Sequence, residues 1–220
     1  MPEPTQPGPA FASDYVNLAS PRLGGAIFDV SDEFFAPAKR MLAAEEPVFI
    51  PDLYDEHGKW MDGWESRRKR GPGYDFCTIR LCPGVIHGVE IDTRHFTGNY
   101  APALMLEVCD ADIEPDGQTV WTQIIPKTDI EGDTRQFFAI ESGDTWTFAR
   151  LNIYPDGGVA RLRIYGEPSR VANAGERAQW VDLASARAGG TALECNNMHF
   201  GDMKNLLSNR PVANMGDGWE

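Results

Sequence analysis

The stretch YDFCTIRLCPGVIHGVEIDT, residues 74–93, carries the clearest strand signal in this 220-residue chain. In its first half, Cys77, Ile79 and Leu81 alternate with polar side chains, which is the two-residue period of a strand with one buried face. In its second half, the residues on one face would be Val85, Val89 and Ile91. The stretch therefore predicts two half-buried strands.

Similar short segments follow at close intervals. They are ALMLEV (103–108), VWTQIIP (120–126) and WTFARLNIY (146–154). In LNIYPDGGVARLRIYG (151–166), the Pro-Asp-Gly-Gly turn predicts an antiparallel hairpin, because Pro presets φ and Gly tolerates a positive φ. A helix is indicated in SDEFFAPAKRMLAA (31–44), where Pro37 restricts it to a short one. This pattern predicts an all-β sandwich or barrel.

Composition narrows the classes of partner. The chain has 20 Lys and Arg against 33 Asp and Glu, a net charge of −13, which disfavours binding to nucleic acid and to anionic membranes. The start MPEPTQPGPA lacks the pattern of a signal peptide and no apolar run is long enough to span a bilayer, so a cytoplasmic location is expected. The cysteines form no CxxC pair, which favours buried free thiols at Cys77, Cys82, Cys109 and Cys195.

Two parts of the chain resemble each other. GGAIFDVSDEFFAPAKRML (24–42) matches GGTALECNNMHFGDMKNLL (189–207) at a constant offset of 165 residues. The tetrapeptide DGWE occurs at 62–65 and again at 217–220. A period this long indicates two homologous domains rather than an array of short repeats.

The duplication predicts a domain organisation. Residues 1–23, rich in Pro, Ala and Ser, are expected to form a flexible lead-in. Residues 24–188 would form a complete first repeat, and residues 189–220 the start of a truncated second repeat. Because so short a segment cannot bury a core of its own, we expect it to pack on the first repeat or on a partner subunit.

Four blocks resemble one protein family. DEFFAPAKRML, PVFIPDLYDEHGKWMDGWESRRKR, PGVIHGVEIDTRHFTGNYAP and LNIYPDGGVARLRIYGEP are similar to recognisable blocks of the allantoicases (allantoate amidinohydrolases), and they cover almost all of residues 24–168. The resemblance implies two similar jelly-roll β-sandwiches of the galactose-binding-like type, with short helices. It also implies hydrolysis of allantoate to ureidoglycolate and urea in purine breakdown.

Allantoate carries a carboxylate and two ureido groups on one carbon, so its hydrolysis needs an anion clamp, a general acid and a general base. The candidates for proton transfer are Asp62, Glu65 and His95. Asp62 and Glu65 are three residues apart, so each could raise the pKa of the other. The alternative is that Trp64 is a core anchor and that the basic run RRKR (67–70) is a solvated loop.

Candidates for substrate binding lie in three places. They are Arg67 and Arg68 after DGWE, Thr97 and Asn99 in the loop HFTGNYAP (95–102), and Arg161 and Arg163 on one face of the strand after Pro-Asp-Gly-Gly. Alternatively, the loop residues hydrogen-bond their own turn and the two strand arginines bridge to neighbouring acids.

His87 and Asp92 are secondary candidates. His87 is in phase with Val89 and Ile91, which favours a buried core histidine. The four histidines show neither HxH nor HExxH, and no cofactor is evident. A hard cation such as Mn²⁺, held by carboxylate and carbonyl oxygens, would leave no sharp pattern, so a metal site stays undetermined.

Two other functions are compatible with the sequence. A non-catalytic binding module could stack a sugar on Trp60, Trp64 and Tyr100, since one sandwich fold serves many functions. A truncated homologue could fold without turning over substrate, or could need an oligomer to complete its site. Allantoate is the expected small-molecule partner, and a homo-oligomer is the expected assembly.

Overall fold

The computed structural model describes residues 8–111, 114–169, 182–208, 212 and 214–220, and strands dominate it. The strands are β1 (Val16–Asn17), β2 (Ala26–Val30), β3 (Tyr54–Asp55), β4 (Gly58–Lys59), β5 (Trp64–Glu65), β6 (Asp75–Asp92), β7 (Ala103–Cys109), β8 (Thr122–Asp129), β9 (Arg135–Ala139), β10 (Thr145–Tyr154), β11 (Gly158–Val159) and β12 (Arg161–Pro168). The helices are α1 (Ala10–Asp14) and the 3-10 helices η1 (Pro21–Leu23), η2 (Ala38–Leu42), η4 (Ala186–Ala188), η5 (Met203–Leu207) and η6 (Met215–Asp217). Among the described residues, no helix has the length and apolar character needed to cross a membrane. The predicted all-β fold and the short helix within residues 31–44 are confirmed.

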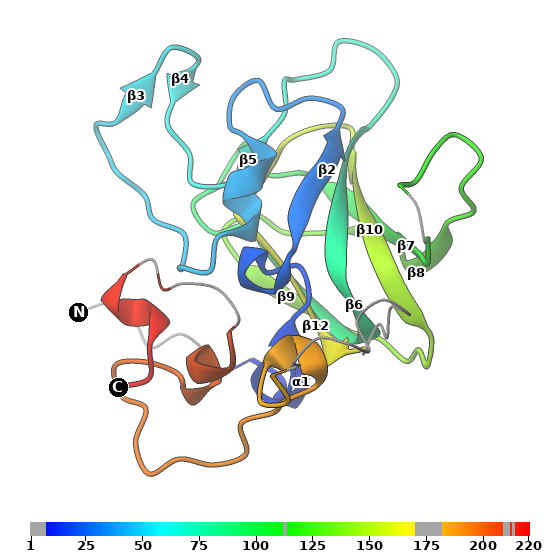
Figure 1. Ribbon diagram of the computed structural model, residues 1–220. Helices are drawn as coiled ribbons and strands as arrows, with labels where there is room; N and C mark the ends of the chain where they lie inside the picture. The colour runs from blue at the N-terminus through cyan, green and yellow to red at the C-terminus, as the bar shows by residue number, and fades with distance from the viewer. Residues whose placement is uncertain (1–7, 112–113, 170–181, 209–211, 213) are drawn as a thin grey trace.

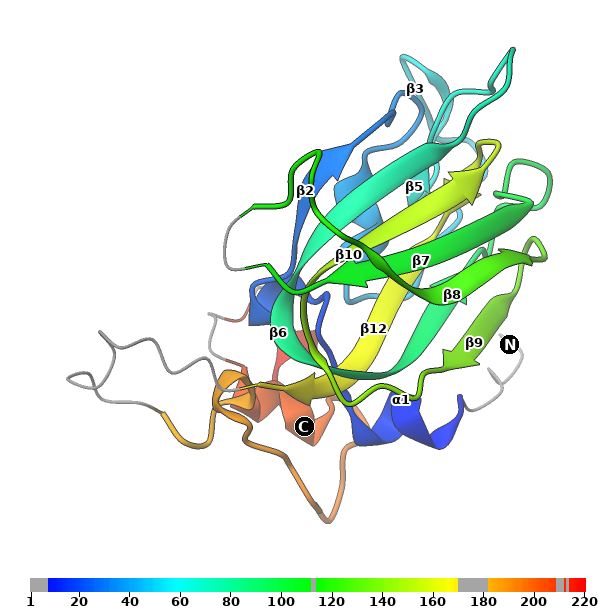
Figure 2. The same cartoon turned by 90° about the vertical axis from the view of Figure 1, so that its right-hand side faces the viewer.

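The long strand β6 belongs to both sheets of a sandwich. Its first half pairs with β2 and β10, and its second half pairs with β12 and β9. The strand passes from one sheet to the other at Gly84 and Val85, which pair with both β10 and β12. One sheet therefore has the order β2-β6-β10-β7-β8 and the other β1-β12-β6-β9, with β6 curving between them (Figures 1 and 2). The two predicted strands of residues 74–93 are thus one bent strand.

Apolar side chains from both sheets fill the space between them. The fully buried ones include Cys77, Ile79, Val89 and Ile91 of β6, Leu104 and Leu106 of β7, Leu151 of β10, and Leu162 and Ile164 of β12. Burial of such side chains is the main favourable term in folding. Cys77, Cys82 and Cys109 are buried free thiols, as predicted, whereas Cys195 is partly exposed.

A β-bulge changes the phase of β6 at His87. Tyr165 pairs with Gly88 and Gly166 pairs with Ile86, so His87 has no residue opposite it on β12. The extra residue turns its side chain to the outer face, where the ring stacks on Tyr15 with centroids 4.1 Å apart. The expectation of a buried core histidine is therefore wrong, because a bulge interrupts the two-residue period.

The predicted hairpin at residues 151–166 is not formed. β10 pairs with β6 and β7, whereas β12 pairs with β6 and β1. Ile153 near the end of β10 lies opposite Asp75, and Arg161 at the start of β12 lies opposite Asp92, at the other end of β6. The Pro-Asp-Gly-Gly turn therefore crosses from one sheet to the other.

The N-terminal segment packs into the sandwich from residue 8 onward. β1 pairs with β12, and Leu18 is 0% exposed in the core. Its N–H donates to the carbonyl of Ile164 (2.7 Å), and its carbonyl accepts from Cys82 (2.9 Å). A flexible lead-in is therefore wrong for residues 8–23, since a two-residue strand leaves no periodic signal. The earlier residues of that prediction lie outside the described range.

The two similar segments share local geometry. Ser20 and Ser185 cap η1 and η4 through their side chains, and Gly24 and Gly189 end these helices with φ of 98° and 86°. The counterpart of η2 is η5, again 165 residues further on. The matching backbone also shows that the similarity begins before Gly24.

The two DGWE strings are anchored in the same way. The Trp64 indole donates to the carbonyl of Asp32 (2.8 Å), and the Trp219 indole donates to that of Asn197 (2.7 Å).

Residues 191–195, the counterpart of β2, form no strand in the described structure. The C-terminal segment lies beside the N-terminal one, where Arg22 pairs with Asp217 (Figure 1).

Candidate functional site

Loops from three parts of the chain meet at the end of the sandwich where β10 passes to β12. Within that connection, Gly158 of β11 pairs with Glu65 of β5. On its other side, Gly158 donates to the carbonyl of Asn99 (2.7 Å) and accepts from the N–H of Ala101 (3.2 Å). β11 therefore ties the first DGWE segment to the loop that follows β6.

Two glycines permit this close approach. Gly157 has a φ of 128°, and a Cβ there would overlap the backbone of Tyr100. A Cβ at Gly158 would overlap the ring of Phe96. The glycines that predicted a hairpin turn thus serve as the spacer between two loops of the site.

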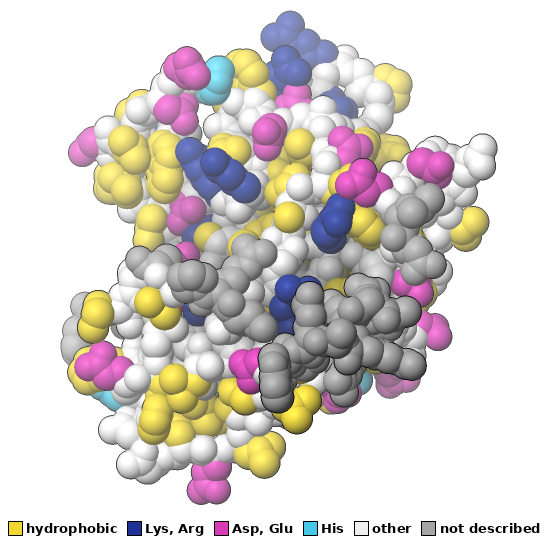
Figure 3. All heavy atoms as spheres, in the orientation of Figure 1, with side chains coloured by type: hydrophobic (Ala, Val, Ile, Leu, Met, Phe, Trp, Pro, Cys, Tyr) yellow, Lys and Arg dark blue, Asp and Glu magenta, His cyan; other side chains and the backbone are white. Residues whose placement is uncertain are grey.

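The basic run after DGWE is held by aspartates from other segments. The pairs are Arg67–Asp32 (2.6 Å), Arg68–Asp156 (3.0 Å) and Lys69–Asp75 (2.8 Å). Arg68 also donates to the carbonyl of Gly98 (2.8 Å). Figure 3 shows Lys and Arg side chains gathered at the top of this face, over the loop between β5 and β6. Arg67, Arg68 and Lys69 are therefore held in position at this surface.

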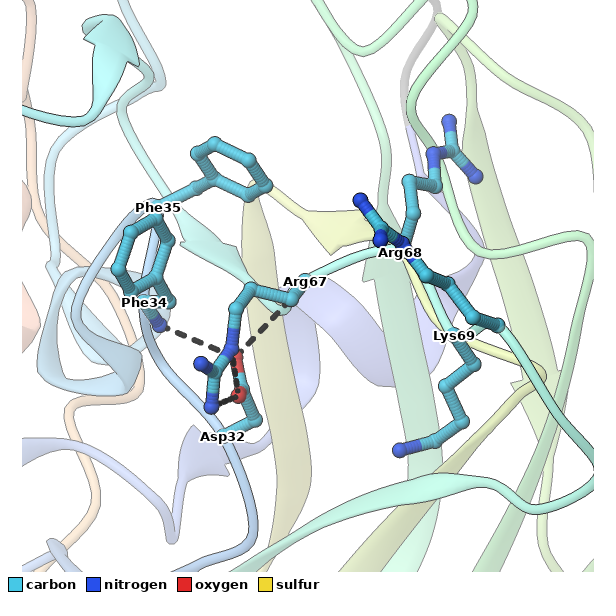
Figure 4. Close-up of a pocket in the computed structure, with 7 residues that line it drawn as sticks. Asp32, Phe34, Phe35, Arg67, Arg68 and Lys69 are labelled. Atoms are coloured by element: carbon cyan, nitrogen blue, oxygen red, sulfur yellow. Dashed lines mark hydrogen bonds and ion pairs between the residues drawn. The ribbon is translucent and has the colours of Figure 1, made fainter.

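A cavity of about 580 Å³ opens between residues 32–35 and the basic run. It is lined by Asp32, Phe34, Phe35, Arg67, Arg68, Lys69 and Arg70. Figure 4 shows Arg67 turned down to Asp32 beside Phe34, with Arg68 and Lys69 on the opposite side. The side chains of Arg67 and Arg68 keep 62% and 55% of their surface exposed. Their remaining N–H groups are thus available to a carboxylate.

Glu65 differs from the aspartates of the site, because no Lys or Arg of the described structure forms an ion pair with it. Its Oε1 accepts a hydrogen bond from Nδ2 of Asn99 (2.9 Å). Burial raises the pKa of Glu65, and the Asn99 hydrogen bond and the charge of Arg68 offset this only in part. Burial acts on Asp32 too, but hydrogen bonds from Arg67 and Phe34 outweigh it and leave the pKa of Asp32 lowered.

Asp62 and Glu65 belong to different networks. Asp62 pairs with Arg161 (2.7 Å) and accepts a hydrogen bond from the N–H of Val48 (3.0 Å). Arg161 is 1% exposed and also donates to the carbonyl of Glu45 (2.8 Å). This arginine therefore fastens the loop around residues 45–48 to the DGWE segment.

Arg163 and Asp92 lie in a second buried network, on the outer face of the sheet that contains β12. Glu90 is fully buried and pairs with Arg135 (2.7 Å) and Arg163 (3.2 Å). Asp92, also fully buried, pairs with Arg94 (2.5 Å). Removing one partner would leave a buried unpaired charge, so these groups depend on one another as part of the scaffold.

The remaining candidates lie around this end of the sandwich. The His95 ring nitrogen Nε2 is 3.0 Å from the carbonyl oxygen of Pro47. Thr97 is exposed in the loop that carries Asn99. Trp64 is fully buried, which confirms the core-anchor interpretation and leaves no face for a sugar. Among the described residues, no group of three His, Cys, Asp or Glu side chains is arranged to hold a metal ion.

Asp32, Asp156 and Gly158 carry no local sequence pattern that marks them as site residues. Asp32 is 35 residues from Arg67 in the chain, and Asp156 is 88 from Arg68. The sequence pointed to these residues only through the segments that contain them. Asp32 lies in the segment 24–42 that recurs at 189–207, and Asp156 and Gly158 lie in the Pro-Asp-Gly-Gly turn.

Comparisons of sequence connect this chain with one family. A family model described as an allantoicase repeat matches residues 16–169. "Probable allantoicase 2" of Burkholderia mallei (strain ATCC 23344) is 50% identical over 215 residues, which is 96% of this chain and 64% of that protein. "Probable allantoicase" of Pseudomonas aeruginosa (strain UCBPP-PA14) is 51% identical over 208 residues, covering 94% and 63%. The chain thus spans somewhat less than two thirds of the curated relatives' length.

Solved structures of allantoicases are also similar to this chain. A structure titled "Structure of allantoicase" superposes with a TM-score of 0.79 at 31% identity, covering 95% of this chain and 64% of that one. The crystal structure of allantoicase from Saccharomyces cerevisiae gives a TM-score of 0.77 at 32% identity, with the same coverage. The sandwich and its end loops are therefore similar to an experimentally known fold.

Proposed function

The chain belongs to the allantoicase family, and from this premise we propose that it hydrolyses allantoate to ureidoglycolate and urea. The family predicted from the sequence blocks is confirmed by the repeat model that matches residues 16–169. The match contains the whole sandwich together with the basic run and the loop of Asn99.

The proposed anion clamp consists of Arg67 and Arg68. A guanidinium group presents paired N–H donors that fit the two oxygens of a carboxylate. Asp32 and Asp156 hold these side chains in place, while more than half of each side chain stays exposed. Arg161 and Arg163, the other predicted clamp, are themselves buried and already bound to Asp62, to the carbonyl of Glu45 and to buried Glu90.

Glu65 is the proposed general acid. A water oxygen bonds to the central carbon of allantoate, and the C–N bond to one ureido group breaks with its electron pair going to nitrogen. Protonated Glu65 gives that nitrogen its proton, so urea leaves as a neutral molecule. The resulting carboxylate takes up the proton that the water loses.

The observation that carries the proposal is the environment of Glu65. It is a half-buried carboxyl without a cationic partner among the described residues, and its pKa is raised. It adjoins the pocket through Arg68, which lines the cavity and acts electrostatically on Glu65. A carboxyl whose pKa is raised by burial beside a cleft is a candidate catalytic acid.

The test is urea release from allantoate by the Glu65→Gln variant. We expect a loss of roughly 100-fold or more in kcat, the usual contribution of a general acid. The matched control is Glu141→Gln, the same change at an exposed glutamate between β9 and β10. Equal rates for Glu65→Gln and the control would refute the assignment. Assays with and without added Mn²⁺ decide whether a divalent cation takes part.

Residues 189–220 are proposed as the start of a second repeat, which the shared geometry of η1 with η4 and of the two DGWE strings supports. A homo-oligomer in the cytoplasm, without nucleic acid or membrane partners, is proposed from the charge and family. Light scattering of the purified protein tests the assembly.

A further inference from the structure

Gly158 sets the distance between Glu65 and Asn99. Its backbone pairs with Glu65 on one side and bonds to the carbonyl of Asn99 on the other. The short strand β11 therefore stands between the segment that carries the acid and the loop that carries the amide. Because both sides are fixed by backbone hydrogen bonds, the relative position of the two side chains is set by the fold.

The amide of Asn99 bonds to one oxygen of Glu65 only. Nδ2 donates to Oε1 at 2.9 Å. Oε2 has no hydrogen-bond partner among the described residues. An N–H donor occupies a lone pair of the oxygen that it contacts, so a proton on Glu65 is favoured on Oε2.

The other carboxylates at this end of the sandwich are held differently. Asp32, Asp156, Asp75 and Asp62 each accept hydrogen bonds from Arg or Lys side chains. Each of these carboxylates is thus engaged by a cationic side chain. Glu65 instead has a neutral donor, which fixes its orientation and leaves it able to be protonated.

On the basis of the proposed function, we propose that Asn99 is a positioning residue: it holds Oε1 of Glu65 as an acceptor and leaves Oε2 as the oxygen that carries and delivers the proton. Asn99 then acts through Glu65 rather than by binding substrate. The transferred proton leaves Oε2 for the ureido nitrogen as the C–N bond breaks, and the carboxylate that remains keeps its hydrogen bond to Nδ2.

The test is a pH titration of the Asn99→Ala variant. The Asn99 hydrogen bond stabilises the ionised form of Glu65, so its removal should raise the pKa of that carboxyl by about one unit. A general acid works in its protonated form, so activity is present below its pKa and is lost as pH rises through it. The alkaline limb of kcat should therefore move about one pH unit higher in Asn99→Ala.

A second readout needs no substrate. The carboxyl of Glu65 is followed by carbon NMR in protein labelled at glutamate, and its signal is assigned by its absence in Glu65→Gln. Its titration midpoint should rise in Asn99→Ala and rise further in Asn99→Asp, where a like charge faces the carboxyl. Gln118→Ala, which removes an exposed amide between β7 and β8, is the control and should leave both midpoint and limb unchanged.

The outcomes separate the two proposals. If Glu65→Gln is inactive while the Asn99 variants keep the wild-type midpoint, the positioning role is wrong and the proposed function stands. If Glu65→Gln keeps the wild-type rate, the proposed site itself is wrong. Should Asn99→Ala not fold, as judged by circular dichroism, Asn99→Asp keeps the side-chain volume, and an unshifted midpoint there overturns the inference equally.

Discussion

At the scale of single residues, the two carboxyls of the first DGWE string have different environments. Asp62 and Glu65 are equivalent candidates by spacing, yet Asp62 pairs with buried Arg161 and Glu65 has only the amide of Asn99. The sequence made Glu65 and Arg68 candidates through their place in and just after DGWE and through the resemblance to the allantoicases. It could not tell the two acids apart, because their partners come from segments about 34 and 99 residues away.

The geometry of Arg68 leads to a prediction for substrate affinity. Arg68→Lys keeps the positive charge but loses the paired donors that match a carboxylate. We expect the KM for allantoate to rise roughly tenfold, the equivalent of one strong hydrogen bond. Arg80→Lys is the matched control, since Arg80 pairs with exposed Glu114. Steady-state kinetics that give the same KM for both variants would argue against a clamp at Arg68.

At the scale of elements, pairing across the sandwich overrides the local pattern. The alternation in residues 74–93 predicted strands correctly, but not that one strand would bend through both sheets. The bulge at His87 depends on its partner β12, which lies over 70 residues away in the sequence. The Pro-Asp-Gly-Gly turn predicted a hairpin that is not formed. Nothing within the turn shows that β10 and β12 pair with opposite ends of β6.

The strand β11 yields a prediction about glycine. In Gly158→Ala the added methyl group meets the ring of Phe96, so β11 must shift. We expect a loss of stability of about 1–3 kcal/mol, as for other overpacked sites, and a larger loss of urea release. The control is Gly143→Ala, because a Cβ at Gly143 has open space. Chemical denaturation of both variants gives the comparison, and similar stabilities would contradict the spacer role.

At the scale of the whole molecule, the N-terminal residues complete one sheet and part of the core. The composition of residues 1–23 predicted a flexible lead-in, because Pro, Ala and Ser carry no period. Leu18 is nevertheless buried between strands that lie far along the chain. The similarity of residues 24–42 and 189–207 was visible in the sequence, and the same caps and indole hydrogen bonds recur in the C-terminal segment.

Leu18 provides the test of this packing. Leu18→Ala should lower the free energy of unfolding by roughly 2–5 kcal/mol, the usual cost of a cavity at a buried leucine. Leu193→Ala is the matched control, because Leu193 is 89% exposed. Denaturant titration of both variants checks the difference. Equal stabilities would mean that the N-terminal segment contributes little to the core.

The most direct test of the whole account is to measure binding and turnover of allantoate in the same Glu65→Gln protein. Because the variant leaves the proposed clamp of Arg67 and Arg68 untouched, calorimetry should show allantoate bound with a Kd within about threefold of the wild-type KM, while urea release falls roughly 100-fold or more. Urea release by Glu65→Gln at the wild-type rate would contradict the claim that this end of the sandwich hydrolyses allantoate through Glu65.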